Sequence, residues 1–198
     1  MSVGPLRAWL YLNWFYAGLL TALFLLIITP VLWHLWPLSL LVVFLQLPVY
    51  MIHQVEEHHH DRFRRYINEH IAHGLGALSP DAVLVINLGG VWLLDLCALY
   101  LAHFIRPGLG MVAMYMSVVN GIVHVIGTII ERQYNPGAIT GALLLLPAGL
   151  AGCWIITRAG ETTASDHVWA LAIAVLVHIV IVGWVAFRFK RLKRATTA

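Results

Sequence analysis

The segment from Leu38 to His60 reads LSLLVVFLQLPVYMIHQVEEHHH, an apolar run that ends in a cluster of ionisable side chains. A helix needs about 20 mostly apolar residues to cross the hydrocarbon core of a bilayer. The run therefore predicts a membrane-spanning helix, and its histidines and glutamates lie where that helix meets the membrane boundary. Only 11% of the chain is charged, so a cluster of ionisable residues at one place needs an explanation.

Five further segments have the length and apolar character of membrane spans. Hydrophobic residues make up 61% of the 198-residue chain, and its charged fraction is far below the roughly 25% of soluble domains. We therefore predict an all-α fold, a polytopic membrane helix bundle with about six transmembrane helices in a single domain, residues 1–198. The spans are expected at about 10–33, 38–57, 82–103, 109–131, 138–157 and 167–188, with a cytoplasmic interfacial segment at 58–80.

Basic residues are distributed unevenly between the two sides of this predicted bundle. Six spans place both termini on one side, together with all the lysines and arginines except Arg106 and Arg158. The positive-inside rule then places both termini in the cytoplasm and the chain in the inner membrane of the cell. The basic tail after residue 187 is expected to contact membrane lipids, and no nucleic acid is expected because no folded basic domain accompanies it.

The ionisable residues after residue 52 share one face of the predicted helix. At about 100° per residue, His53, Glu56, Glu57 and His60 point in similar directions. His53 is expected inside the hydrocarbon layer, near its cytoplasmic boundary. Ionisable groups at such a depth face the bundle interior and pair with one another or with a cation.

The segment 109–131 offers a matching face at the same depth. His124 and Glu131 lie on it, and this span runs in the same direction as the span 38–57. Mixed imidazole and carboxylate ligands suit zinc, iron or manganese. We predict a divalent metal ion, zinc by preference, and leave open whether His58, His59, His70 and His73 join it. The predicted ligands are His53, Glu57, His124, His60 and Glu131.

Three separated motifs resemble those of the HXXEE domain family of small bacterial membrane proteins. HQVEE at His53–Glu57 matches the family's naming motif, His124 matches a further family histidine, and YNPG at Tyr134–Gly137 matches a Y-x-P-G motif. The resemblance spans roughly residues 20–150. Because the function of the family is unassigned, it points to residues rather than to a reaction. His60 and Glu131 come from helical spacing alone.

The Y-x-P-G motif also has a direct physical interpretation. Pro136 ends one helix and starts the next, while Gly137 permits a tight turn. Tyr134 would then lie at the cytoplasmic mouth of the site, where its hydroxyl group can polarise a substrate or bind a carboxylate. We predict Tyr134 and Glu56 as catalytic residues, with Glu56 as the general base.

These features favour a membrane-embedded, metal-dependent enzyme that hydrolyses a lipid or other apolar small-molecule substrate. A di-iron membrane oxygenase is the first alternative, and the number of ligands separates the two, because two irons require six or more. A metal or proton transporter is the second alternative, since ionisable residues within spans also form ion pathways. The paired glutamates do not match intramembrane glutamate proteases, because the following arginine is one position too far away.

Overall fold

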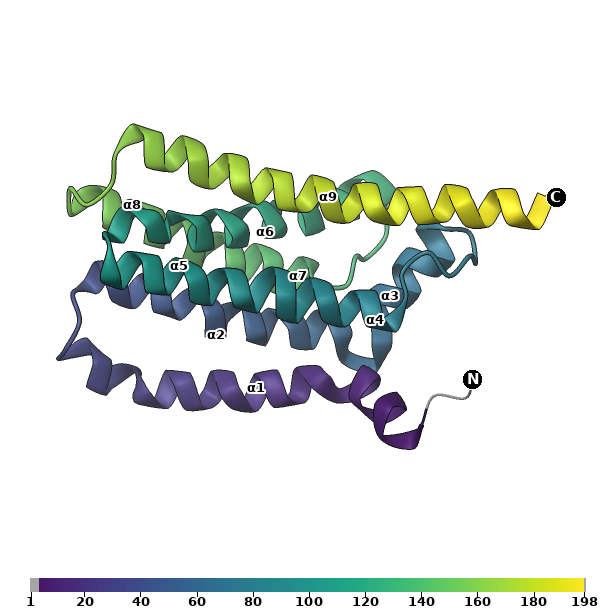
Figure 1. Ribbon diagram of the computed structural model, residues 1–198, viewed down its shortest axis with the longest axis horizontal. Helices are drawn as coiled ribbons and strands as arrows, with labels where there is room; N and C mark the ends of the chain where they lie inside the picture. The colour runs from purple at the N-terminus through teal and green to yellow at the C-terminus, as the bar shows by residue number, and fades with distance from the viewer. Residues whose placement is uncertain (1–3, 198) are drawn as a thin grey trace.

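The computed structural model describes residues 4–197, which form helices packed lengthwise in a bundle (Figure 1). Six helical segments within this range are long and apolar enough to cross a membrane, and no strand occurs among the described residues. The predicted all-α membrane bundle with six spans is therefore confirmed. Its long unbroken helices are α1 (Pro5–Trp33), α2 (Leu38–His58), α6 (Met111–Glu131) and α9 (Ala164–Thr197).

Two of the six spans are composite, because a wider π-helical stretch interrupts each of them. The third span consists of α4 (Pro80–Leu84), η3 (Val85–Trp92) and α5 (Leu93–Phe104). The fifth consists of α7 (Ala138–Thr140), η5 (Gly141–Leu145) and α8 (Leu146–Arg158). A short 3-10 turn, η4 (Pro107–Gly110), precedes α6 in the fourth span. Such π-helical turns occur frequently at functional sites.

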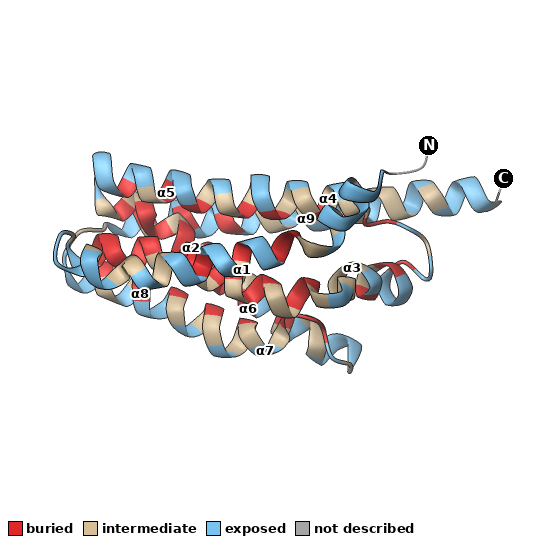
Figure 2. Cartoon of the chain, turned by 90° about the horizontal axis from the view of Figure 1, so that it is seen from below, coloured by how far each residue is buried: buried red, intermediate tan, exposed pale blue. Residues whose placement is uncertain are grey.

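Burial is concentrated in α2 and the inner face of α6, whereas α1 and α9 expose most of their surface (Figure 2). The exposed residues of α1 and α9 are largely leucine, isoleucine, valine, phenylalanine and tryptophan. Lipid chains are as apolar as these side chains, so a membrane bundle has no reason to hide them. Many of the buried polar residues lie on α2, which carries the naming motif.

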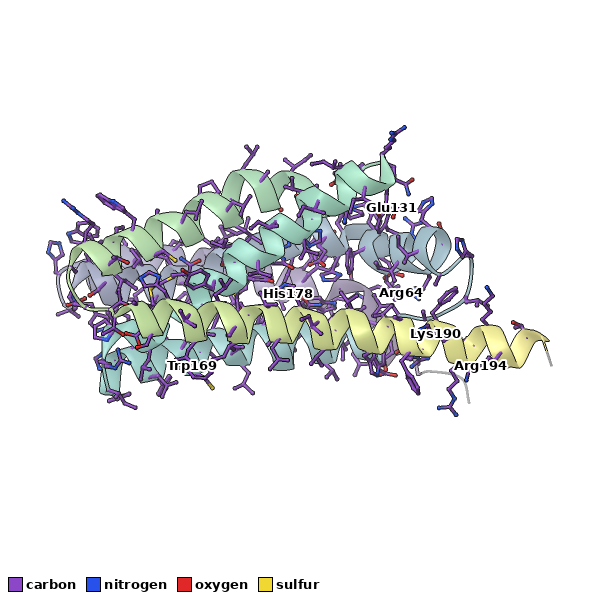
Figure 3. All side chains as sticks on the ribbon, turned by 90° about the horizontal axis from the view of Figure 1, so that it is seen from above. Arg64, Glu131, Trp169, His178, Lys190 and Arg194 are labelled. Atoms are coloured by element: carbon purple, nitrogen blue, oxygen red, sulfur yellow. The ribbon has the colours of Figure 1, made fainter. Side chains whose placement is uncertain are left out.

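The start of α1 and the end of α9 lie at the same end of the bundle (Figure 1). Arg64, Lys190 and Arg194 are found at this end in Figure 3. Basic residues of two separate segments therefore lie at the end where both termini lie, as the positive-inside argument requires. That this end faces the cytoplasm stays a prediction.

The segment after α2 turns away from the axis of that helix. His60 and Asp61 adopt left-handed backbone angles, with φ of 55° and 59°, and a 3-10 turn, η1 (His59–Asp61), replaces the α-helix there. Short helical pieces follow, α3 (Arg62–Tyr66) and η2 (Ile67–Ile71). Aspartate and histidine tolerate the left-handed region better than most residues, which explains why the helix ends here.

Two side chains fix the return of this segment to the membrane. The amide group of Asn68 donates to the carbonyl of Leu78 at 2.9 Å and accepts from its backbone N–H at 2.8 Å. The hydroxyl of Ser79 then accepts from the N–H of Ala82 at 3.3 Å and caps α4. Pro80 is the first residue of α4, a position where proline is favoured because its missing N–H needs no partner there.

The fourth and fifth spans approach each other closely at a pair of glycines. A Cβ atom on Gly121 would lie 2.8 Å from the carbonyl oxygen of Gly141, and one on Gly141 would touch Gly121 and the Cβ of His124. Helices separated by glycine alone can bring their backbones together. This contact places the N-terminal turns of the fifth span directly against His124.

Candidate metal centre

His53 and Glu57 on α2 meet His124 on α6 in the buried interior of the bundle. The Nε2 atom of His53 lies 3.7 Å from Glu57 Oε2, and the Nε2 atom of His124 lies 3.8 Å from Glu57 Oε1. One ligand atom from each residue falls within 4.8 Å of the other two, and all three side chains are buried. This group can bind a metal ion. Helical spacing of four residues brings His53 and Glu57 together, and equal depth brings His124 to them.

The tautomer of His53 follows from the hydrogen bonds around it. Thr140 Oγ1 donates its single proton to the carboxylate of Glu56, so it can only accept from the Nδ1 atom of His53, 2.8 Å away. The proton of the ring is therefore on Nδ1, and Nε2 carries no proton of its own and lies 3.7 Å from Glu57 Oε2. Asn120 accordingly donates to Nε2 at 3.1 Å.

His124 is held in the same tautomer by a different partner. Its Nδ1 atom lies 3.1 Å from the side-chain oxygen of Asn135, which can only accept. Thr128 fixes the position of Asn135, because its hydroxyl accepts from the N–H of Asn135 and donates to the carbonyl of His124. A metal-binding histidine usually donates its other ring nitrogen to such an oxygen.

The Nε2 atoms of His53 and His124, neither carrying a proton of its own, thus converge on the carboxylate of Glu57, and the N–H of Asn120 satisfies the one on His53. Two Nε2 lone pairs and an anionic carboxylate in an apolar interior are unfavourable unless a cation joins them. Ligands of a tetrahedral zinc ion, with bonds of 2.0–2.1 Å, lie roughly 3.3 Å apart, so side chains whose ligand atoms lie within 4.8 Å of one another must draw together to bind it. Asn120, which donates to the Nε2 atom of His53, would have to withdraw for that atom to bind a cation.

Gly137 closes the site from above. Its φ is 103°, and a Cβ atom there would lie 2.7 Å from His124 Cε1 and 2.9 Å from His53 Cε1. The position therefore requires glycine twice, for its backbone angle and for the space between the two imidazole rings. Pro136 is buried beside it and leads into α7. The turn role predicted for Pro136 and Gly137 matches this geometry.

Glu56 points away from the cluster toward the N-terminus of α7. Its carboxylate accepts from the hydroxyl of Tyr134 and from the backbone N–H groups of Ile139 at 3.1 Å and Thr140 at 2.6 Å. Both carboxylate oxygens thus accept hydrogen bonds at the start of a helix, where unpaired N–H groups and the helix dipole favour an anion. Desolvation, followed by the hydrogen bond to Glu56, raises the pKa of Tyr134 to about 12.

Two predicted ligands lie outside the cluster. His60 is exposed on the left-handed turn after α2, because the helix that would have placed it beside His53 ends at His58. Glu131 is exposed at the end of α6, and its carboxylate is not part of the cluster. Equal helical spacing does not bring either residue to the metal position, so their assignment as ligands finds no geometric support.

The structure adds partners that sequence spacing did not identify. His58 is buried, and its Nε2 atom lies 3.2 Å from Glu57 Oε2, while its ring packs on Trp14 with 4.9 Å between ring centroids. His178 on α9 lies 3.3 Å from the side-chain oxygen of Asn120 (Figure 3). Asn135 is the variable residue of the Y-x-P-G motif and Thr140 follows the motif by three positions, and only that location signals their role. His59, His70 and His73 are not part of the group.

A cavity of about 590 Å³ opens beside this cluster. Glu57, His58 and His124 form part of its wall, and most of the remaining wall is apolar. Tyr134 and Glu56 do not line it. The size is that of a small-molecule binding site, in which a few polar groups orient a largely apolar ligand.

These features define a class, a six-span helical membrane protein with a buried His/Glu cluster beside an apolar cavity. A family model described as "Protein of unknown function with HXXEE motif" matches residues 44–152, which is more than half of the chain. The chain belongs to this family. The match begins later than the predicted residue 20 and includes the naming motif, His124 and the Y-x-P-G turn. No curated protein and no solved structure matches the chain significantly.

Proposed function

We propose that the protein is a membrane-embedded, metal-dependent hydrolase, with zinc as its cation and a lipid or other apolar molecule as its substrate. One observation carries this proposal, the convergence of two unprotonated Nε2 atoms on Glu57 at the wall of an apolar cavity. A bound divalent cation supplies a Lewis acid that lowers the pKa of water to about 7 and so makes a nucleophile available at neutral pH.

The number of ligands favours one metal ion over two. The cluster comprises three residues among those that the structure describes, and the other histidines after α2 lie elsewhere. A dinuclear iron centre requires six or more ligands. The di-iron oxygenase alternative therefore has little support, whereas three protein ligands with an open position are typical of catalytic zinc.

The chain's own residues divide into ligands and supports. His53, Glu57 and His124 would hold the cation, and Thr140 and Asn135 orient the two imidazole rings. The apolar wall of the cavity excludes water from the bound substrate, while His58 contacts Glu57 from the same wall. The contacts of Glu56 and Tyr134 favour a positioning role, holding the α7 turn against the rings, over the catalytic roles expected from sequence.

Elemental analysis of the detergent-purified, untagged protein tests the metal centre directly. We expect about one equivalent of zinc, lost in His53→Ala and retained in His60→Ala. His60 is the matched control because it lies near the same helix end but outside the cluster. Release of fatty acid from long-chain ester lipids, present in the wild type and absent in His53→Ala, then tests hydrolysis.

Three outcomes of this experiment would contradict the proposal. Equal metal content in His53→Ala and the wild type would show that this cluster does not bind the metal. Two equivalents of iron would favour the oxygenase. Zinc without any ester hydrolysis would leave a metal site of another purpose.

Ion transport is the second candidate, and a single residue favours it. Asp95 on α5 is buried, and neither of its carboxylate oxygens has a hydrogen-bond partner within the described residues. Ionisable residues within spans often belong to ion pathways. Zinc flux into proteoliposomes that depends on Asp95 would favour transport over hydrolysis.

A further inference from the structure

The cavity beside the cluster is a chamber built from several parts of the chain, among them the end of α2 with Glu57 and His58. The second halves of α6 and α9 form two of its walls, and η3 contributes a third. The segment after α2 covers it, because Phe63, Ile67 and Ile71 face the space and the Asn68–Leu78 hydrogen bonds hold that segment down. An apolar ligand bound here would be shielded from water on the side of the loops.

The chamber is open toward the membrane between α6 and α9. Ile126 and Ile130 on α6 and Val182 on α9 line the chamber and are also exposed on the outside of the bundle. The two helices diverge toward the end that carries Glu131 and Lys190 in the view of Figure 3. In a membrane, lipid chains would surround these apolar, exposed side chains, so a lipid could enter sideways without crossing water.

The charges on the chamber wall restrict what can bind. Among the residues that the structure describes, no lysine or arginine lines it, whereas Glu57 and Glu131 do. A phosphodiester or other permanently anionic headgroup would therefore lose its hydration without gaining a basic partner. Other polar groups on the wall, among them the side chains of Asn120, Asn135 and Tyr50, can form hydrogen bonds with an uncharged ligand.

We propose that this chamber binds an uncharged long-chain lipid, which enters between α6 and α9 and directs its ester, amide or hydroxyl group toward Glu57 and His124. This lipid would be the substrate of the proposed hydrolase, and that role rests on the proposed function. The binding itself does not depend on turnover. A long apolar chain would occupy the α6–α9 side, and the polar end would reach the part of the wall formed by Glu57, His58 and His124.

Photolabelling with a diazirine-bearing monoacylglycerol tests the chamber without requiring activity. In the wild type we expect crosslinks on residues 123–130 and 181–189, prevented by excess unlabelled monoacylglycerol but not by phosphatidylglycerol. Competition by phosphatidylglycerol that equals or exceeds that of monoacylglycerol would overturn the proposed headgroup class. Crosslinks spread evenly over α1 and the outer face of α9 would show lipid contact without a site.

Two pairs of variants separate the chamber from the lipid-facing surface. Ile130 and Val182 line the chamber, whereas Ile129 and Val180 do not, although the exposed fractions are nearly equal, at 69% and 68% on α6 and 60% and 61% on α9. Ile130→Trp and Val182→Trp should reduce labelling about tenfold, the effect of a steric mismatch in an apolar pocket. Ile129→Trp and Val180→Trp should leave it unchanged, and equal effects in both pairs would refute the entrance.

Zinc content measured in the same samples separates this inference from the proposed function. Retained zinc with reduced labelling in Ile130→Trp is the expected result. Specific labelling in a protein that holds no zinc would support the chamber and contradict the hydrolase. Zinc with no specific labelling would contradict the chamber alone.

Discussion

Replacement of Gly137 by alanine should damage both the fold and the metal centre. The residue has φ 103°, and a side chain at positive φ costs roughly 1–2 kcal/mol. The new Cβ atom would lie 2.7 Å from His124 Cε1 and 2.9 Å from His53 Cε1. Normal carbon contacts are about 3.5–4.0 Å, so the rings would have to move by roughly 0.6–1.3 Å. Metal–ligand bonds stay within about 0.2 Å of their usual lengths, so rings held apart by the new methyl group bind poorly, and we expect zinc affinity to fall at least tenfold.

The matched control is Gly160→Ala. Gly160 also has a positive φ, 71°, but nothing lies within 4 Å of the position that its Cβ atom would take. Its substitution should lower the free energy of unfolding by a similar backbone term and leave zinc affinity unchanged. Competition with a chromogenic chelator measures the affinity, and thermal unfolding in detergent measures the stability. Wild-type zinc affinity in Gly137→Ala would refute the reasoning that the turn holds the two rings.

Two further predictions concern the glutamate that binds the turn. Glu56→Gln should lower the free energy of unfolding by about 1–3 kcal/mol and weaken zinc binding, because an amide cannot accept from all the donors that meet at Glu56. Calorimetry measures the stability and chelator competition measures the zinc affinity. Unchanged stability with loss of turnover alone would restore Glu56 as the general base. The pKa of Tyr134 is raised to about 12, so its hydrogen bond should contribute stability that is fully present below pH 10 and is lost as the pH rises through 12. Absorbance titration of the phenolate, with Tyr134→Phe as the blank, measures this pKa, and ionisation at or below pH 10 would contradict it.

Local rules predicted the membrane architecture well. The length of each apolar run and the thickness of the hydrocarbon layer determine a span without reference to any other part of the chain. Helical period likewise placed His53 and Glu57 together, since residues four apart on a helix are neighbours by geometry alone. His124 could be matched to them because alternating spans have known directions, and depth follows from position along each span.

The same rules did not predict the details of the site. His60 fits the helical period but lies outside the cluster, because α2 ends two residues earlier in left-handed turns. Glu56 and Glu57 look equivalent in sequence, yet one serves the α7 N-terminus and the other faces the imidazoles. Adjacent residues on a helix point about 100° apart, and only the neighbouring helices decide what each direction meets.

Hydrophobicity and helical geometry act within one segment. Sequence alone therefore predicted that the chain spans a membrane, how many spans it has, and which residues lie at the same depth in it. Tertiary structure alone decided that Thr140 and Asn135 fix the tautomers of the two histidines, that Gly137 separates their rings, and that a chamber opens between α6 and α9. These features arise from contacts between segments distant in the chain, and no local pattern specifies how such segments pack.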